Sequence, residues 1–217
     1  ESLSKAEQFV YTLSQIERID EKVDCLRFML LLKEDYDTVM PKIKTLALAC
    51  KEAKSSKGLR NILKLILQIG SILNRDTYLS GNGFRLQSLK SIAETKAKCG
   101  GVTLVHYLSQ LIGEHEPELL YFLENEIPHC YEASRISMDV INLRVKEVSQ
   151  QIKLVEKELS YYTSGKENIT SDNQDIDKAT KQFASSLSQF YTKAQKQVDA
   201  MEKSSITLKK LYIEVGT

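Results

Sequence analysis

The side chains best suited to acid–base or metal chemistry are few in this sequence and lie far apart. The three histidines are His106, His115 and His129, and none stands at metal-ligand spacing from a second histidine or a cysteine. His129 and Cys130 are adjacent, so on a helix their side chains would diverge by about 100°. The histidines therefore predict neither a metal site nor a Cys–His nucleophile.

Two glycine-containing segments, Gly81-Asn82-Gly83 and Gly100-Gly101, are the candidates for phosphate binding. A phosphate-binding loop normally follows a strand and ends in a Gly-Lys-Ser/Thr run at the start of a helix, and neither segment has this context. No convergent set of polar residues marks a catalytic pocket elsewhere in the sequence. We therefore predict that the protein is not an enzyme and uses no cofactor.

The four cysteines are also scattered, at positions 25, 50, 99 and 130, and none belongs to a C-x-x-C pair. This spacing disfavours both a zinc site and the disulfide framework of a secreted domain. Cys25 and Cys50 fall within apolar helical patterns, where cysteine acts as a small buried hydrophobe. The cysteines predict a reduced, cytoplasmic protein.

The overall charge is nearly balanced, with 30 basic and 29 acidic residues. Acidic residues are interspersed throughout, so the sequence predicts no nucleic-acid stripe and no attraction to an anionic membrane. No segment reaches the roughly 20 apolar residues that a membrane-spanning helix needs. A short basic run includes Lys51, Lys54, Lys57 and Arg60. We interpret it either as a solvated face or as a contact with an acidic partner.

The pattern of apolar residues predicts an all-α protein. Only three prolines and nine glycines interrupt a sequence rich in helix-forming residues. Ser4 and Glu7 form a capping-box pattern that begins a first helix. Helical spacing predicts further helices at about 20–33, 36–54 and 59–73. The last of these is apolar almost all round, so we expect it to be buried on most sides.

The stretch from residue 58 to residue 131 has short elements and mixed periodicity, which predicts a compact globular helical unit. Gly70 lies in an apolar helix, where glycine permits a close backbone approach. Gly83 can adopt a positive φ just before the large side chain of Phe84. These features predict a fixed pocket or ledge, which is to say a rigid recognition surface.

The character of the sequence changes after Ala133, where apolar residues recur three and four positions apart. Such a heptad seam indicates a coiled coil. A polar segment at 163–175 separates it from a second seam, so we expect a long antiparallel hairpin; the alternative is two helices lying on a globular body. The seam residues are Met138, Ile141, Val145, Val148, Ile152, Val155, Leu159 and Tyr162, then Phe183, Leu187, Phe190, Ala194, Val198, Met201, Ser205, Leu208, Tyr212 and Val215.

The segment from residue 70 to residue 97 resembles the signature of the second formin homology domain. That signature reads G-N-x-x-N, a variable loop, G-F-x-L-x-x-L-x-K-L, and D-T-K-S. The matching residues are Gly70-Ser71-Ile72-Leu73-Asn74, then Gly83-Phe84-Arg85-Leu86-Gln87-Ser88-Leu89-Lys90-Ser91-Ile92, then Glu94-Thr95-Lys96-Ala97.

Further motifs extend the resemblance over essentially the whole chain. Residues 103–108 are similar to the family's T-L-L-H-Y-L, residues 115–120 to its H-x-P-E-L-L, and residues 133–136 to its A-[AS]-[KR]-V. Upstream, Ala6-Glu7-Gln8-Phe9 and Pro41-Lys42-Ile43 also fit. The chain departs from the family at Ser71, at Ala97 and in a short loop at 75–82.

The resemblance implies an elongated all-α helical bundle with a globular, post-like unit and a coiled-coil hairpin. It assigns 1–57 to the end of the knob and connecting helices, 58–131 to the post, and 132–217 to the coiled coil with a loop near 163–175. In the family, the post takes up the N-terminal lasso of a second subunit. The post signature corresponds here to Gly70, Asn74, Gly83, Phe84, Leu86 and Leu89.

The resemblance also implies function. Formins of this family nucleate actin filaments and remain on barbed ends as dimers, and the parent protein is expected to meet profilin-bound actin through adjacent regions. The family's basic actin contacts match Lys22, Lys96 and Arg135. We expect the lasso, the linker and much of the knob before Glu1, so we expect this chain alone to assemble actin weakly or not at all.

A competing hypothesis is a helical scaffold that binds microtubules or signalling proteins without assembling actin. An enzyme is the weakest of the three classes. The formin hypothesis predicts a cytoplasmic, cytoskeletal protein. Its partners would be actin and a second formin subunit, not nucleic acid or a membrane.

Overall fold

A computed structural model describes residues 4–73, 83–96, 101–164 and 174–216. All regular secondary structure in these ranges is helical, apart from an isolated antiparallel bridge between Lys96 and Thr103. The predicted all-α class is therefore confirmed. The chain divides into two compact units. The first comprises Glu1–Lys44 and Ile136–Lys210, and the second comprises Thr45–Arg135 and Leu211–Thr217.

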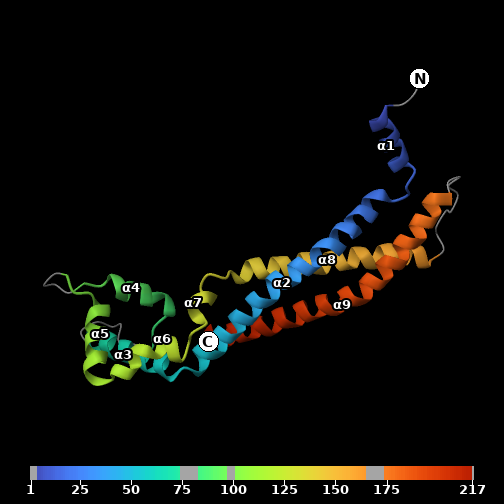
Figure 1. Cartoon of the computed structure of the whole chain (residues 1–217). Coiled ribbons are helices and arrows are strands. Elements are labelled where there is room, and N and C mark those ends of the chain that lie inside the picture. Colours follow the sequence, from blue (N-terminus) through green and yellow to red (C-terminus); the bar gives the residue numbers. More distant parts are fainter. Residues whose placement is uncertain (1–3, 74–82, 97–100, 165–173, 217) are drawn as a thin grey trace. The chain divides into compact units, whose positions relative to one another are not determined.

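The first unit is a bundle of three long helices that run side by side (Figure 1). They are α2 (Ile19–Ser55), α8 (Met138–Thr163) and α9 (Gln174–Gly216), of which α2 and α9 continue into the second unit. A short α1 (Lys5–Ser14) precedes them and begins with the predicted capping box, in which Ser4 and Glu7 exchange hydrogen bonds. The predicted hairpin of α8 and α9 is present, and α2 packs against it as a third helix.

The predicted break between residues 33 and 36 is wrong, because α2 is one helix from Ile19 to Ser55. Asp35 lies at the expected break, yet it is buried and its carboxylate accepts two hydrogen bonds from Arg144 of α8. Pro41 also lies inside the helix, although an interior proline costs about 3 kcal/mol. Burial of one apolar face along the helix, at Cys25, Phe28, Leu32, Val39, Ile43 and Leu46, offsets that cost.

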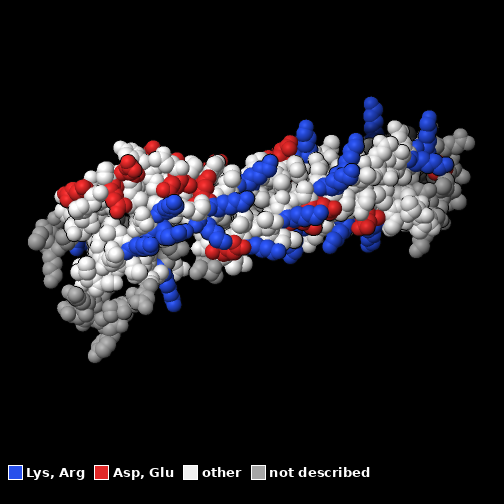
Figure 2. Space-filling model, turned by 90° about the horizontal axis from the view of Figure 1, so that it is seen from below, with Lys and Arg blue, Asp and Glu red and all other residues white. Residues whose placement is uncertain are grey.

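The core of the first unit follows the two predicted seams closely. On α9, Leu187, Ala194, Met201 and Leu208 are each 0% exposed. On α8, the buried seam positions are Ile141, Val145, Val148, Ile152 and Val155. Tyr212 departs from the prediction, since it is 57% exposed. The outer faces of the helices carry the charged residues (Figure 2).

A buried ion pair fixes the joint between α1 and α2. Arg18 has a left-handed backbone with φ 54°, which a side chain with a Cβ rarely adopts. Its guanidinium donates to Glu158 Oε2 at 3.0 and 2.6 Å, and Glu158 is 1% exposed. The Tyr162 hydroxyl donates to the other carboxylate oxygen at 2.8 Å, and the guanidinium lies 4.6 Å from the centre of the Tyr161 ring. These contacts compensate both the buried charge and the backbone strain.

Replacing Arg18 by Ala should destabilise the chain, because it leaves the Glu158 carboxylate buried without its cation. We expect a loss of about 2–3 kcal/mol, below the usual range for a broken buried pair since Arg18 keeps some solvent contact. Thermal and urea unfolding followed by circular dichroism measure the loss. The control is Arg27→Ala, an exposed arginine of α2, and equal midpoints for the two variants would contradict the assignment.

The second unit, which contains residues 58–131, is built mainly from shorter helices. After the end of α2 come α3 (Lys57–Leu73), η1 (Leu86–Ser88), α4 (Leu89–Glu94), α5 (Leu104–His115), η2 (Pro117–Tyr121), α6 (Phe122–Asn125) and α7 (Cys130–Ala133). Among the helices that the structure describes, none is both long and apolar enough to cross a lipid bilayer.

Three expectations about this unit are wrong. Helix α3 is not buried on most sides, since Ile72 and Leu73 are 68% and 65% exposed. A Cβ at Gly70 would meet no atom within 4 Å, so no close backbone approach requires glycine there. Gly83 does not have a positive φ, whereas Gly101 does. The apolar run of α3 faces a groove and open surface rather than a closed core.

Candidate functional site

The amino terminus of α3 is held by a single carboxylate. Glu126, just after α6, accepts hydrogen bonds from the Ser56 hydroxyl at 2.6 Å and from the Gly58 N–H at 2.9 Å. Ser56 in turn accepts from the Leu59 N–H at 2.9 Å, as a helix N-cap does. The Ser56 hydrogen bond, followed by that of Gly58, lowers the pKa of Glu126 and keeps it ionised. A negative charge at this end of a helix is favourable.

Gly58 permits the close contact between α3 and α6. A Cβ at this position would lie 2.6 Å from Phe122 Cβ and 3.2 Å from a carboxylate oxygen of Glu126. Phe122 Cβ is attached directly to the backbone of α6, so it cannot move aside without a shift of that helix. Glycine is therefore required here for steric reasons, and not at Gly70.

The two glycines of α3 provide a matched test. We expect Gly58→Ala to lower the free energy of unfolding by about 1–3 kcal/mol, the range for overpacking. Gly70→Ala should leave stability unchanged or raise it by about 0.5–1 kcal/mol, because alanine is the better helix former. Chemical unfolding of both variants measures the difference, and a Gly70→Ala loss as large as that of Gly58→Ala would refute the explanation.

The spacing of Thr103 and His106 has a structural explanation in α5. Thr103 is the N-cap of this helix, and its hydroxyl lies 2.7 Å from His106 Nδ1 and accepts from the His106 N–H at 3.4 Å. His106 thus completes a capping box, in the place that Glu or Gln usually takes. The Leu104 N–H also donates to the Thr95 carbonyl at 2.9 Å. These bonds hold Lys96 beside the start of α5, where its side chain is exposed.

A second anchor holds α7 to the end of α2. Glu52 accepts from the His129 backbone N–H at 3.1 Å, and its other oxygen lies 2.6 Å from His129 Nδ1. The Cys130 thiol donates to the Ala49 carbonyl at 3.6 Å. Arg135 follows α7 directly; its guanidinium lies 4.5 Å from the centre of the Tyr131 ring and donates to the Tyr131 hydroxyl. Arg135 is thus presented on the surface by a fixed turn.

An open groove of about 830 Å³ lies between α3 and the segment that begins at Phe84. Leu59 and Leu63 line it from α3, and Phe84 and Leu89 line it from the facing segment. Lys54 and Glu214 stand at one side, 2.6 Å apart, in an exposed ion pair of small energetic weight. The remaining lining residues are Ala53, Arg85, Gln87 and Val215. The groove has the apolar floor and polar edge expected of a peptide-binding surface.

The predicted post residues are only partly gathered at this groove. Phe84 and Leu89 line it. Gly70 and Gly83 do not line it, although Gly70 lies on α3 and Gly83 immediately precedes Phe84. Leu86 is in η1, but its side chain lies outside the described residues, as does all of Asn74.

The predicted actin contacts are divided between the two units. Lys96 and Arg135 are exposed in the second unit and do not line the groove beside Phe84. Lys22 belongs to the first unit and is 8% exposed, with its ammonium 6.0 Å from the centre of the Tyr162 ring. Its side chain therefore packs within the bundle next to Arg18, and its role in binding stays a prediction.

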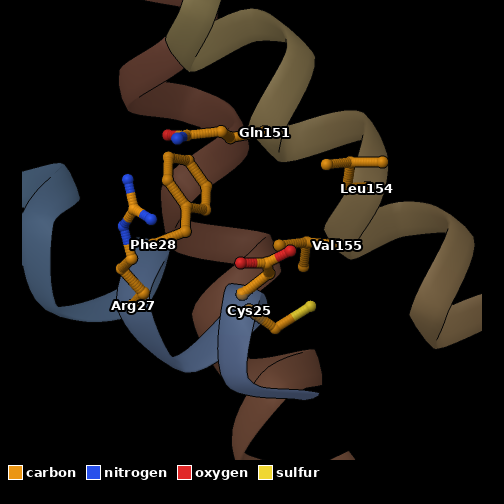
Figure 3. A pocket seen from close by; sticks show the side chains of 7 residues that line it. Cys25, Arg27, Phe28, Gln151, Leu154 and Val155 are labelled. Atoms are coloured by element: carbon orange, nitrogen blue, oxygen red, sulfur yellow. The ribbon is translucent and has the colours of Figure 1, made fainter. Parts of the chain in front are cut away.

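The first unit contains a small cavity. It measures about 120 Å³ and lies between α2 and α8, with Phe28 from α2 and Gln151, Leu154 and Val155 from α8 around it (Figure 3). Burial raises the pKa of the Cys25 thiol at its edge to about 11, so this cysteine stays protonated near neutral pH. Among the described residues, no group of three or more His, Cys, Asp or Glu side chains could hold a metal ion.

Comparison with known proteins identifies the family. The model of the formin homology 2 domain matches residues 1–216. The chain belongs to the formin homology 2 domain family. It is 32% identical over 217 residues to formin-like protein 14 of Arabidopsis thaliana, covering 100% of this chain and 16% of that protein. It is 27% identical over 212 residues to protein diaphanous homolog 3 of Homo sapiens, covering 97% of this chain and 17% of that protein.

Protein diaphanous of Drosophila melanogaster is similar to the same extent, with 29% identity over 217 residues and 19% of its length covered. The chain thus spans about a sixth to a fifth of the length of these formins. Within this formin homology 2 domain, the sequence motifs mark the groove segment well. They do not mark Gly58 or Glu126, which are separated by 68 residues and carried no periodic signal.

Proposed function

We propose that this chain is the actin-binding portion of a formin homology 2 domain and takes part in actin filament assembly as one subunit of a dimer. Membership of the family over residues 1–216 is the observation that carries the proposal. The printed names of two relatives identify them as formin-like and diaphanous proteins. The formin resemblance described above supplies the expectation of barbed-end binding.

The groove beside Phe84 is the proposed binding site for the lasso of a second subunit. Its apolar lining from Leu59, Leu63, Phe84 and Leu89 suits a large apolar side chain inserted from a partner. The exposed Lys54–Glu214 pair at its side offers hydrogen-bonding partners to the backbone of an extended segment. Phe84 is the expected anchor of this contact because aromatic residues dominate such interfaces.

Substitution of Phe84 by Ala in the complete dimeric domain should weaken dimerisation by about 2 kcal/mol or more, the loss typical of a central aromatic anchor. The dissociation constant, measured by sedimentation velocity over a dilution series, reports the effect. Ile72→Ala is the control, since Ile72 is exposed on α3 and lies outside the groove. Equal dimer affinities for the two variants would place the lasso elsewhere.

Lys96 and Arg135 are the proposed electrostatic contacts with actin in the second unit. Both are exposed, and each is held by neighbouring anchors rather than by an ion pair of its own among the described residues. Basic residues that face an acidic surface mainly accelerate encounter and orient the partner. Lys22 is proposed only as a secondary contributor, because its side chain is buried in the bundle.

Reversal of both charges, Lys96→Glu with Arg135→Glu, should reduce barbed-end assembly by the complete domain about tenfold or more. The assay is fluorescence-monitored actin polymerisation at physiological salt. The charge-matched control is Lys64→Glu with Lys90→Glu, two exposed lysines of α3 and α4. Unchanged activity of the Lys96/Arg135 variant would favour the scaffold hypothesis. The same polymerisation assay on the 217-residue chain alone tests whether it assembles actin as weakly as expected.

A further inference from the structure

One side of α9 carries a row of lysines that the proposed function does not use. Between Lys178 and Lys210, six exposed lysines lie within about 60° of one line along the helix, at 100° per residue. We call this row the lysine ridge. Its members are Lys178, Lys181, Lys193, Lys196, Lys203 and Lys210.

The ridge is positive along its length. Apart from Asp199, the positions between the lysines on the same side are uncharged, among them Gln182, Gln189, Thr192 and Thr207. Asp199, at the edge, is engaged by the Gln195 amide, which donates to it at 2.8 Å. None of the ion pairs in the described part of the chain involves a ridge lysine. Figure 2 shows more Lys and Arg than Asp and Glu along the face that it displays.

The opposite side of α9 forms the core of the bundle, which fixes the ridge toward solvent. Leu187, Ala194, Met201 and Leu208 are each 0% exposed, and Val198 is 1% exposed. A rotation of α9 that hid the lysines would expose these side chains. Burial of each of the larger ones contributes roughly 1.5–3 kcal/mol to stability. The ridge is therefore a permanent feature of the surface.

The spacing of the ridge suits an extended chain. Lys196, Lys203 and Lys210 are seven residues apart, which is roughly 10.5 Å at 1.5 Å per helical residue. An extended polypeptide advances about 10 Å in three residues, so a carboxylate at every third position would meet each lysine in turn. These separations exceed the Debye length of about 8 Å at physiological salt. Each lysine–carboxylate contact therefore adds nearly independently to the binding free energy.

The chemistry of the ridge favours carboxylates over phosphates and lipids. Its cations are all lysines, without the arginine fork that grips phosphate through two hydrogen bonds. No aromatic side chain lies on the ridge between residues 178 and 210 to stack on a base. Most large apolar side chains of α9 in this stretch are buried on the other side. Ile206, which is 55% exposed, is an exception, and a single such side chain gives little hold on a lipid surface.

We propose that the lysine ridge of α9 is a docking surface for an extended acidic polypeptide segment. The segment lies along the helix, with its Asp or Glu carboxylates near successive lysines. This contact is separate from the groove beside Phe84 and from Lys96 and Arg135, which belong to the other unit. It does not depend on actin assembly.

Binding of fluorescent poly-L-glutamate to the 217-residue chain at 50 mM salt, followed by anisotropy, tests the proposal. The triple variant Lys196→Glu, Lys203→Glu, Lys210→Glu should bind at least tenfold more weakly. The matched control reverses three exposed lysines of α8, Lys146, Lys153 and Lys157, and changes the net charge by the same amount. It should bind within about twofold of the unmodified chain. Equal weakening in both triple variants would overturn the proposal.

Two further arms keep the result interpretable. If the glutamate variant loses helix content by circular dichroism, the Lys→Gln triple at the same positions replaces it, with at least threefold weaker binding expected. Duplex DNA and phosphatidylserine vesicles are titrated in parallel. Binding of either one as tightly as poly-L-glutamate, through the same lysines, would overturn the assignment to an acidic polypeptide.

Discussion

The second unit depends on the carboxylate of Glu126 at the amino terminus of α3. This group compensates the unpaired N–H groups that begin a helix, and it ties Ser56 and Gly58 to the turn after α6. The direction of α3 is set at this end, because its later turns are partly exposed and contribute little packing of their own. The groove has Leu59 and Leu63 on one side. Its shape therefore depends on a hydrogen-bonded anchor several residues away from its lining.

Buried charges play the corresponding part in the first unit. An apolar seam alone permits three helices to slide past one another by whole turns at modest cost. Arg18 with Glu158, and Asp35 with Arg144, join α8 to the start and the middle of α2. A shift by one turn would leave those carboxylates buried without a cation, which is far more costly than a misplaced leucine. We infer that these pairs specify the alignment of α2 with α8.

The two units differ in how they present binding surfaces. In the second unit, capping boxes and side-chain anchors hold short segments, so apolar side chains such as Phe84 are displayed around an open groove. In the first, long helices bury their apolar seams and leave mainly charged and polar side chains outside, with single exposed apolar residues such as Leu30 and Leu154. An inserted apolar side chain suits the first kind of surface, and an extended charged segment suits the second. A formin homology 2 domain can in this way carry separate contacts on separate parts of one chain.

The helical class, the seams of α8 and α9 and the family could be predicted from the sequence, because hydrophobic period and local motifs are properties of neighbouring residues. Val148 and Leu187 were assigned to the core from spacing alone and are 1% and 0% exposed. The motif drew attention to Phe84 and Leu89, which both line the groove, and their part in recognition stays a prediction. Three features became apparent only from the folded chain: α2 continues through Asp35 and Pro41, Glu158 is buried, and Gly58 rather than Gly70 requires glycine. Each of these depends on a partner far away in the sequence, such as Arg144, Arg18 or Phe122, and no local pattern records the energy of such a contact.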